Sequence, residues 1–169
     1  MTTPAPAAAP AVTNNPASAL DNVMALAAQG RLAIADLFGA AAVLTESGQP
    51  QVAIALYHTW IAHSDARLIY AACFNLAVVL SNTGDDAGAE AALRKAIANN
   101  ANFVEARLNL GSLLERTGRP DDALAMWQSI LDGGLVPDIK TTPALYVHCL
   151  LYTSPSPRDL STSRMPSSA

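Results

Sequence analysis

Apolar residues recur along the middle of the chain at intervals of three and four residues, which is the spacing of one buried face of an α-helix. Three segments with this pattern run up to a glycine, and we expect them to be helices over residues 34–47, 70–82 and 104–116. A second helical segment follows each of them and is expected to end near residues 63, 99 and 131. The pattern therefore predicts an all-α chain of consecutive helix–turn–helix units.

The turns between these helices carry residues with capping chemistry. Gly48, Gly84 and Gly118 follow the first helix of each unit, and glycine readily takes the left-handed conformation that ends a helix. The second helix of each unit is expected to begin at Pro50, at Asp85 or Asp86, and at Pro120. Proline at the first helical position loses no hydrogen bond, and aspartate can accept bonds from the unpaired N–H groups of the first turn.

The units are copies of one another. The segment TGDDAGAEAALRKAI from Thr83 aligns with TGRPDDALAMWQSIL from Thr117, 34 residues later, and SGQPQVAIALYHTWI from Ser47 is an earlier copy. Small residues recur at two positions of each unit, namely Ala41, Ala77 and Gly111, and Ala53, Ala89 and Ala123. Side chains of this size let the axes of paired helices approach closely, so we expect the helices to cross there.

A period of about 34 residues with helix–turn–helix character is typical of the tetratricopeptide repeat (TPR), and the chain resembles this family over residues 34–137. The resemblance implies three repeats in a right-handed superhelix, an α-solenoid that binds other proteins. Trp60 departs from the family pattern, which usually has alanine at that position. We also expect an N-terminal helix in the segment 18–33, which ends at or close to Gly30, and the start of a truncated fourth repeat over residues 138–148.

Charge and hydropathy narrow the possible partners. The net charge is −4, and the Lys and Arg residues form no basic stripe of the kind that binds a phosphate backbone, so nucleic acid is not expected. The longest apolar run, over residues 68–80, is shorter than the roughly 20 residues that span a bilayer. Residues 1–17 are rich in Pro and Ala and lack the basic start of a secretory signal. We expect them to form a disordered leader, and the protein to be cytoplasmic without membrane contact.

No group of residues indicates catalysis. His58 and His63 are five residues apart and so do not share the helix face that an i, i+4 metal pair uses. Cys73 lies in an apolar run and is interpreted as a small buried hydrophobe. The aspartate pairs at the starts of second helices are interpreted as caps. We therefore expect no catalytic residue, no metal site, no cofactor and no enzyme activity within the chain.

The first helices of a TPR superhelix line its concave surface, and this makes their outward positions the candidate binding site. The positions that we expect to line the surface are small or polar: Asn75, Val78, Asn82, Glu105, Asn109, Ser112 and Arg116. An asparagine side chain offers both a donor and an acceptor. A row of such amides could hold the backbone of an extended peptide whatever its sequence.

Three segments carry a closer resemblance, namely Leu-Tyr-x-x-Trp-Ile at 56–61, FNLAVVLSNTGD at 74–85 and LNLGSLLERTGRPDDALAMW at 108–127. They resemble bacterial O-linked N-acetylglucosamine transferases of the SPINDLY type. In that family the repeats present protein substrates through asparagines like Asn75 and Asn109, and a following domain transfers the sugar. The resemblance implies a substrate-presenting N-terminal fragment of such a glycosyltransferase, without its catalytic domain.

A freestanding TPR adaptor is the alternative. Adaptors that bind acidic chaperone tails do so through a clamp of basic residues. That clamp is absent here, where two of the matching positions hold Glu105 and Asn109. The first repeat departs from the glycosyltransferase pattern as well, because Gly39 occupies the position at which the row of asparagines would continue.

The chain changes character at about residue 149. The segment CLLYTSPSPRDLSTSRMPSSA has no helical periodicity, so we expect residues 149–169 to be disordered. It resembles a translated sequencing adapter appended to many unrelated proteins, and we expect it to be non-native. A solenoid needs a polar cap on its last repeat. Without one, the outer face at Ile130 and Leu131 is expected to fray or to self-associate.

Overall fold

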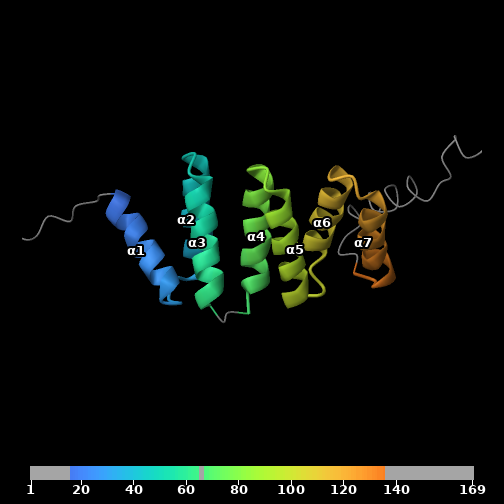
Figure 1. Ribbon diagram of the computed structural model, residues 1–169. Helices are drawn as coiled ribbons and strands as arrows, with labels where there is room; N and C mark the ends of the chain where they lie inside the picture. The colour runs from blue at the N-terminus through green and yellow to red at the C-terminus, as the bar shows by residue number, and fades with distance from the viewer. Residues whose placement is uncertain (1–15, 65–66, 136–169) are drawn as a thin grey trace, which may run out of the picture.

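The computed structural model describes residues 16–64 and 67–135, which contain seven α-helices and no strand. The helices are α1 (Pro16–Ala28), α2 (Ile34–Glu46), α3 (Pro50–His63), α4 (Ile69–Asn82), α5 (Asp86–Asn99), α6 (Val104–Arg116) and α7 (Pro120–Asp132). They follow one another along a single row from α1 at one end to α7 at the other (Figure 1). The all-α solenoid predicted from the sequence is therefore confirmed.

Three helix hairpins form the row, namely α2 with α3, α4 with α5, and α6 with α7. Their bounds agree with the sequence prediction to within one residue at nearly every end. The glycine after each first helix has a positive φ: 76° at Gly48, 84° at Gly84 and 80° at Gly118. The left-handed conformation ends each first helix, and glycine adopts it readily because it has no Cβ.

The starts of the second helices use the capping residues expected from the sequence. Pro50 and Pro120 are the first residues of α3 and α7. The carboxylate of Asp85 accepts a 2.9 Å hydrogen bond from the backbone N–H of Gly88, so Asp85 caps α5 and the helix itself begins at Asp86. The interpretation of this aspartate pair as a helix start is confirmed.

The core runs along the interior of the row. All six small residues expected at the helix crossings are buried: Ala41, Ala77, Gly111, Ala53, Ala89 and Ala123. Gly111 lies so close to Trp127 that a Cβ built on it would stand 2.6 Å from the indole Cδ1. Cys73 is 1% exposed, as expected for a small core residue, and burial raises the pKa of its thiol.

The N-terminal helix α1 begins at Pro16, two residues before the expected start near Ser18, and ends at Ala28, close to Gly30 as expected. Gly30 then takes a φ of 66°, and the chain runs on outside the helix to Ala33, where α2 starts. Leu32 in this connection is 6% exposed. The leucine is therefore a core residue of the connection and not of the helix.

The first repeat accommodates its unusual Trp60 by packing it against that connection. The side chain is 2% exposed, and its Nε1 donates a 2.8 Å hydrogen bond to the backbone carbonyl of Leu32. The large side chain thus fills space between α3 and the α1–α2 connection. Trp60 ties the N-terminal helix to the first repeat.

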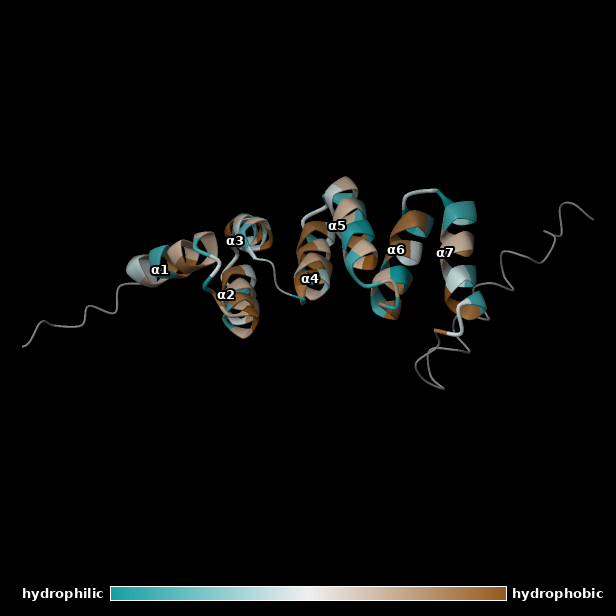
Figure 2. Cartoon of the chain, turned by 90° about the horizontal axis from the view of Figure 1, so that it is seen from below, coloured by the Kyte–Doolittle hydropathy of each residue, from teal (hydrophilic) through white to brown (hydrophobic). Residues whose placement is uncertain are grey.

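Successive repeats meet through α3 with α4 and through α5 with α6. The aromatic rings of Tyr70 and Phe74 on α4 lie 5.0 Å and 5.1 Å from the ring of Phe103, which precedes α6. Figure 2 shows α4 hydrophobic along much of its length, as suits a helix that has neighbours on several sides. This packing fixes α4 relative to α6, and those two helices carry most of the candidate site.

Several expectations concern residues outside the described ranges. They are residues 1–15 of the leader expected over 1–17, the start of a fourth repeat at 138–148 and the tail at 149–169. The last two residues of the expected leader, 16 and 17, are not disordered but form the start of α1. On the last described helix, Ile130 is fully buried and Leu131 is half-buried. Self-association through this end stays a prediction.

Candidate peptide-binding groove

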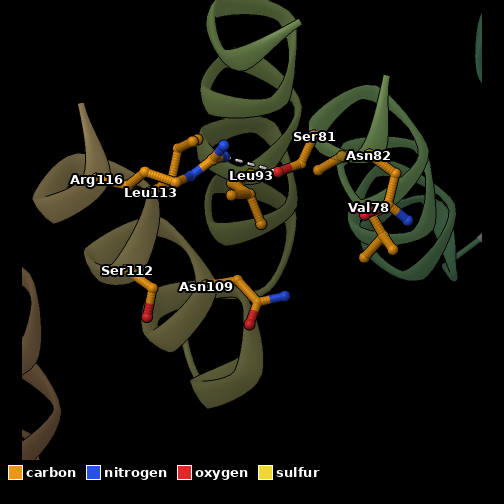
Figure 3. Close-up of a pocket in the computed structure, with 9 residues that line it drawn as sticks. Val78, Ser81, Asn82, Leu93, Asn109, Ser112, Leu113 and Arg116 are labelled. Atoms are coloured by element: carbon orange, nitrogen blue, oxygen red, sulfur yellow. Dashed lines mark hydrogen bonds between the residues drawn. The ribbon is translucent and has the colours of Figure 1, made fainter. Parts of the chain in front are cut away.

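A groove of about 480 Å³ lies between α4 and α6, with α5 behind it (Figure 3). Its lining residues are Ala77, Val78, Ser81, Asn82, Leu93, Asn109, Ser112, Leu113 and Arg116. We call this the α4–α6 groove. It lies between the first helices of the second and third repeats.

Five of the seven residues expected to line the concave face meet in this groove: Val78, Asn82, Asn109, Ser112 and Arg116. All five are exposed. Their positions are three or four residues apart on each helix, so each helix presents them on one face. Figure 3 shows Val78 and Asn82 on one wall and Asn109 with Ser112 on the other.

The remaining two expected residues, Asn75 and Glu105, are not among the lining residues. Asn75 is half-buried, and its side-chain nitrogen donates a 3.0 Å hydrogen bond to the carbonyl of Ala71, one turn earlier on α4. Glu105 is exposed in the first turn of α6, close to its start. The two asparagines at the same repeat position, Asn75 and Asn109, therefore have different surroundings.

The only positive charge in the lining belongs to Arg116, and the structure gives it partners. Its guanidinium donates a 2.7 Å hydrogen bond to the Asp86 carboxylate and a 2.9 Å bond to Ser81 Oγ, the second of which is drawn in Figure 3. Asp86 begins α5 and Ser81 lies near the end of α4. The arginine therefore joins the third repeat to the second at one end of the groove.

A second set of ion pairs also joins these repeats. Arg119, just before α7, binds the Glu90 carboxylate of α5 at 3.0 Å, and Arg94 binds the same carboxylate at 2.6 Å. The hydrogen bond from Arg94 holds the pKa of Glu90 below its ordinary value, against partial burial, and the bond from Arg119 lowers that pKa further. The two ion-pair sets fix the relative placement of α5, α6 and α7.

The structure adds four lining residues that were not expected from the sequence to be part of the binding surface. Ala77, Leu93 and Leu113 are at most 4% exposed and form an apolar floor, while Ser81 is half-buried. Leu93 comes from α5, a second helix. The repeat pattern indicates the outward positions of the first helices. It does not indicate the core residues that close the groove from behind.

The chemistry of the groove suits binding of a neutral backbone. Two amides and two hydroxyls supply donors and acceptors above the apolar floor. Within residues 16–64 and 67–135, no group of three or more His, Cys, Asp or Glu side chains could hold a metal ion. None of the helices described is long and apolar enough to cross a membrane.

Comparison with known families supports the repeat assignment. Models of the tetratricopeptide repeat match residues 70–103 and residues 104–129. These are the second and third repeats, and both matches begin where the sequence analysis placed the start of a repeat. The α4–α6 groove thus lies between two repeats of this family.

Two solved structures share the fold. A crystal structure of MamA is similar with a TM-score of 0.61 at 19% sequence identity, over 79% of this chain and 72% of that one. Another crystal structure of the MamA protein gives 0.55 at 20% identity, over 70% of this chain and 64% of that one. At these identities the likeness shows the fold alone. No curated protein matches the sequence.

Proposed function

We propose that the chain is a protein-interaction scaffold that binds an extended peptide segment of its partner in the α4–α6 groove. The observation that carries this proposal is the meeting of five outward residues from two neighbouring repeats above an apolar floor. A TPR fold supports the proposal, since such helical repeats build extended concave surfaces that bind other proteins.

Asn82 and Asn109 are proposed to hold the peptide backbone. Both are exposed, and they come from different helices, so they can reach a peptide that runs between α4 and α6. Each amide can donate to a carbonyl and accept from an N–H of the peptide. This pairing needs no particular side chain on the peptide, which favours breadth of recognition over strict sequence specificity.

Val78 and the floor are proposed to provide the apolar part of the interaction. Val78 is 38% exposed, and Leu93 and Leu113 lie beneath the groove. A small apolar side chain of the peptide would bury surface against them. Because Arg116 is paired with Asp86, the groove presents no unpaired lysine or arginine to attract an acidic peptide.

The proposed function can be tested with peptides selected from a random library displayed on phage, with the full chain as bait. A selected peptide should bind the wild-type chain in fluorescence anisotropy and lose at least about tenfold in affinity to Val78→Asp. The matched control is Val43→Asp, an exposed valine on α2 outside this groove. A loss in Val43→Asp as large as or larger than that in Val78→Asp, or no loss in either variant, would contradict binding in the α4–α6 groove.

The parent protein is a finer part of this proposal. The sequence resemblance supports a substrate-presenting fragment of a SPINDLY-type glycosyltransferase, and a freestanding adaptor remains the second candidate. Long-read sequencing of the source locus past codon 148 separates them. An open frame that continues into a glycosyltransferase domain supports the fragment, whereas a frame that stops after SPSPRDLSTSRMPSSA supports the adaptor.

A further inference from the structure

One position of the repeat holds a buried side chain in the second and third repeats and an exposed side chain in the first. Val43, Val79 and Leu113 occupy the tenth position of the first, second and third repeats. Val79 is 8% exposed and Leu113 is 4% exposed, whereas Val43 is 65% exposed. An apolar residue occupies this position in all three repeats, but it is exposed only in the first repeat.

This difference in exposure follows from the helices that precede the first helix of each repeat. α4 packs on α2 and α3 of the first repeat, and α6 packs on α5 of the second. Before α2 the described chain has only α1, which packs on α3 as well as on α2. Figure 1 shows α1 tilted relative to the helices of the first repeat. Among the described residues, no helix takes the place before α2 that α2 takes before α4.

An open groove of about 720 Å³ lies at this place, between the first half of α1 and the second half of α2. Its lining residues are Ala19, Leu20, Val23, Gly39, Ala40, Val43, Leu44, Ser47 and Gln49. We call it the α1–α2 groove. Most of these side chains are small or apolar, and the absence of bulk at Gly39 and Ala40 leaves room for another element to approach.

The rim of the groove is acidic. Asp36 lies four residues before Ala40 and Glu46 lies three residues after Val43, so both share a helix face with lining residues. Asp36 and Glu46 are exposed. Residues 16–64 also contain Asp21 and, as the only lysine or arginine, Arg31. An occupant that carries positive charge beside its apolar face would fit this surface best.

We propose that the α1–α2 groove docks an amphipathic α-helix of a partner protein, with apolar residues at i, i+3, i+4 and i+7 and basic residues on its flanks. The occupant is a helix because the preceding repeat covers the equivalent positions in the later repeats with helices. It is basic because Asp36 and Glu46 flank the apolar residues. A second copy of this chain would bring two acidic rims together and is disfavoured.

This second surface is independent of the α4–α6 groove, and a defined probe can test it. The probe is a fluorescein-labelled peptide of about 14 residues with leucine at the apolar positions and lysine elsewhere. A scrambled peptide of the same composition has no apolar face and is the control. In fluorescence anisotropy with the full chain, the amphipathic peptide should bind at least about tenfold more tightly than the scrambled one.

Val43→Asp should weaken binding of the amphipathic probe by about tenfold or more, because it puts a carboxylate in the centre of the apolar lining. Val78→Asp introduces the same change at the exposed valine of the other groove and should leave the affinity unchanged. Circular dichroism should show equal helicity in both variants, since both valines are exposed in the wild-type chain.

The charge on the rim supplies a second variant. Glu46→Lys should weaken binding of the lysine probe and strengthen binding of the same peptide with glutamate in place of lysine. Equal affinity for the amphipathic and scrambled peptides, or an unchanged affinity in Val43→Asp, would overturn the proposal. A wild-type dimer in light scattering that Val43→Asp dissociates would also overturn it, because a second copy would then be the occupant.

Discussion

The indole Nε1 of Trp60 donates a 2.8 Å hydrogen bond to the backbone carbonyl of Leu32, and the residues it joins are 28 positions apart in the chain. Trp60 belongs to α3, whereas Leu32 lies in the connection between α1 and α2. One side chain therefore fixes both the N-terminal helix and the start of the first repeat. The large indole at this position is thus explained by its contact with the connection that follows α1.

Trp60→Phe should lower the free energy of unfolding by about 1–2 kcal/mol, because it leaves the buried carbonyl of Leu32 without this donor. Trp60→Ala also opens a cavity and should cost about 3–5 kcal/mol. Urea unfolding followed by far-ultraviolet circular dichroism measures both. If phenylalanine is tolerated without loss, the hydrogen bond contributes nothing and only the volume of the ring matters.

Two helical glycines should respond to alanine with opposite signs. At Gly111 a new Cβ would meet the indole of Trp127, and this overpacking should destabilise the chain by about 1–3 kcal/mol. At Gly39 a new Cβ would have nothing within 4 Å, so the higher helix propensity of alanine should stabilise the chain by up to about 1 kcal/mol. Thermal unfolding midpoints give the comparison, and a stabilised Gly111→Ala would show that Trp127 moves easily.

Stability should depend on pH through Glu90. Its pKa is lowered in the folded chain, first by the hydrogen bond from Arg94, so its contribution is fully present above the ordinary value of 4.5. The contribution is lost as pH falls further and the carboxylate takes up a proton. Glu90→Gln should therefore lower the unfolding midpoint at pH 7, and its difference from wild type should shrink as pH falls below 4.5.

The same pH series on Glu105→Gln controls for the loss of one negative charge, since Glu105 is exposed at the start of α6. A Glu90→Gln variant whose difference from wild type stays constant from pH 7 to pH 3 would mean that the ion pairs of Glu90 do not stabilise the fold.

The two asparagines at the sixth repeat position should contribute unequally to peptide binding. Asn109 is exposed in the α4–α6 groove, so Asn109→Ala should weaken binding of a selected peptide by about 1–1.5 kcal/mol. Asn75 donates to Ala71 within its own helix, so Asn75→Ala should change the affinity much less. Isothermal titration with both variants measures the difference. Equal losses of affinity in the two variants would support the continuous row of amides that the sequence suggested.

The helices of the repeats were predictable because their ends are marked by local chemistry. Gly84, Pro50 and Pro120 place the turns, and the apolar spacing between them fixes which face is buried. The N-terminal helix was less predictable. Gly30 indicates where it ends, but nothing near Leu32 in the sequence shows that this residue is buried in the connection and bonded by Trp60 of α3. That contact between distant residues leaves no local signal.

The candidate site was predictable in its helix faces but not in its interactions. Repeat spacing alone predicted that Val78, Asn109 and Ser112 share one surface, and all three line the groove. It did not show that Arg116 binds Asp86 across the repeats, because that distance depends on how α5 and α6 pack. The exposure of Val43 was likewise invisible, since its equivalents in the next two repeats are buried.

The central claim is that a peptide binds between α4 and α6, and chemical-shift mapping tests it most directly. An isotope-labelled full chain would be titrated with a phage-selected peptide. The account predicts that the largest shift changes fall on the backbone and side-chain amides of Asn82, Ser112 and Asn109, with little change on α1 and α2. Shift changes confined to α1 and α2, or spread evenly over the chain, would contradict it.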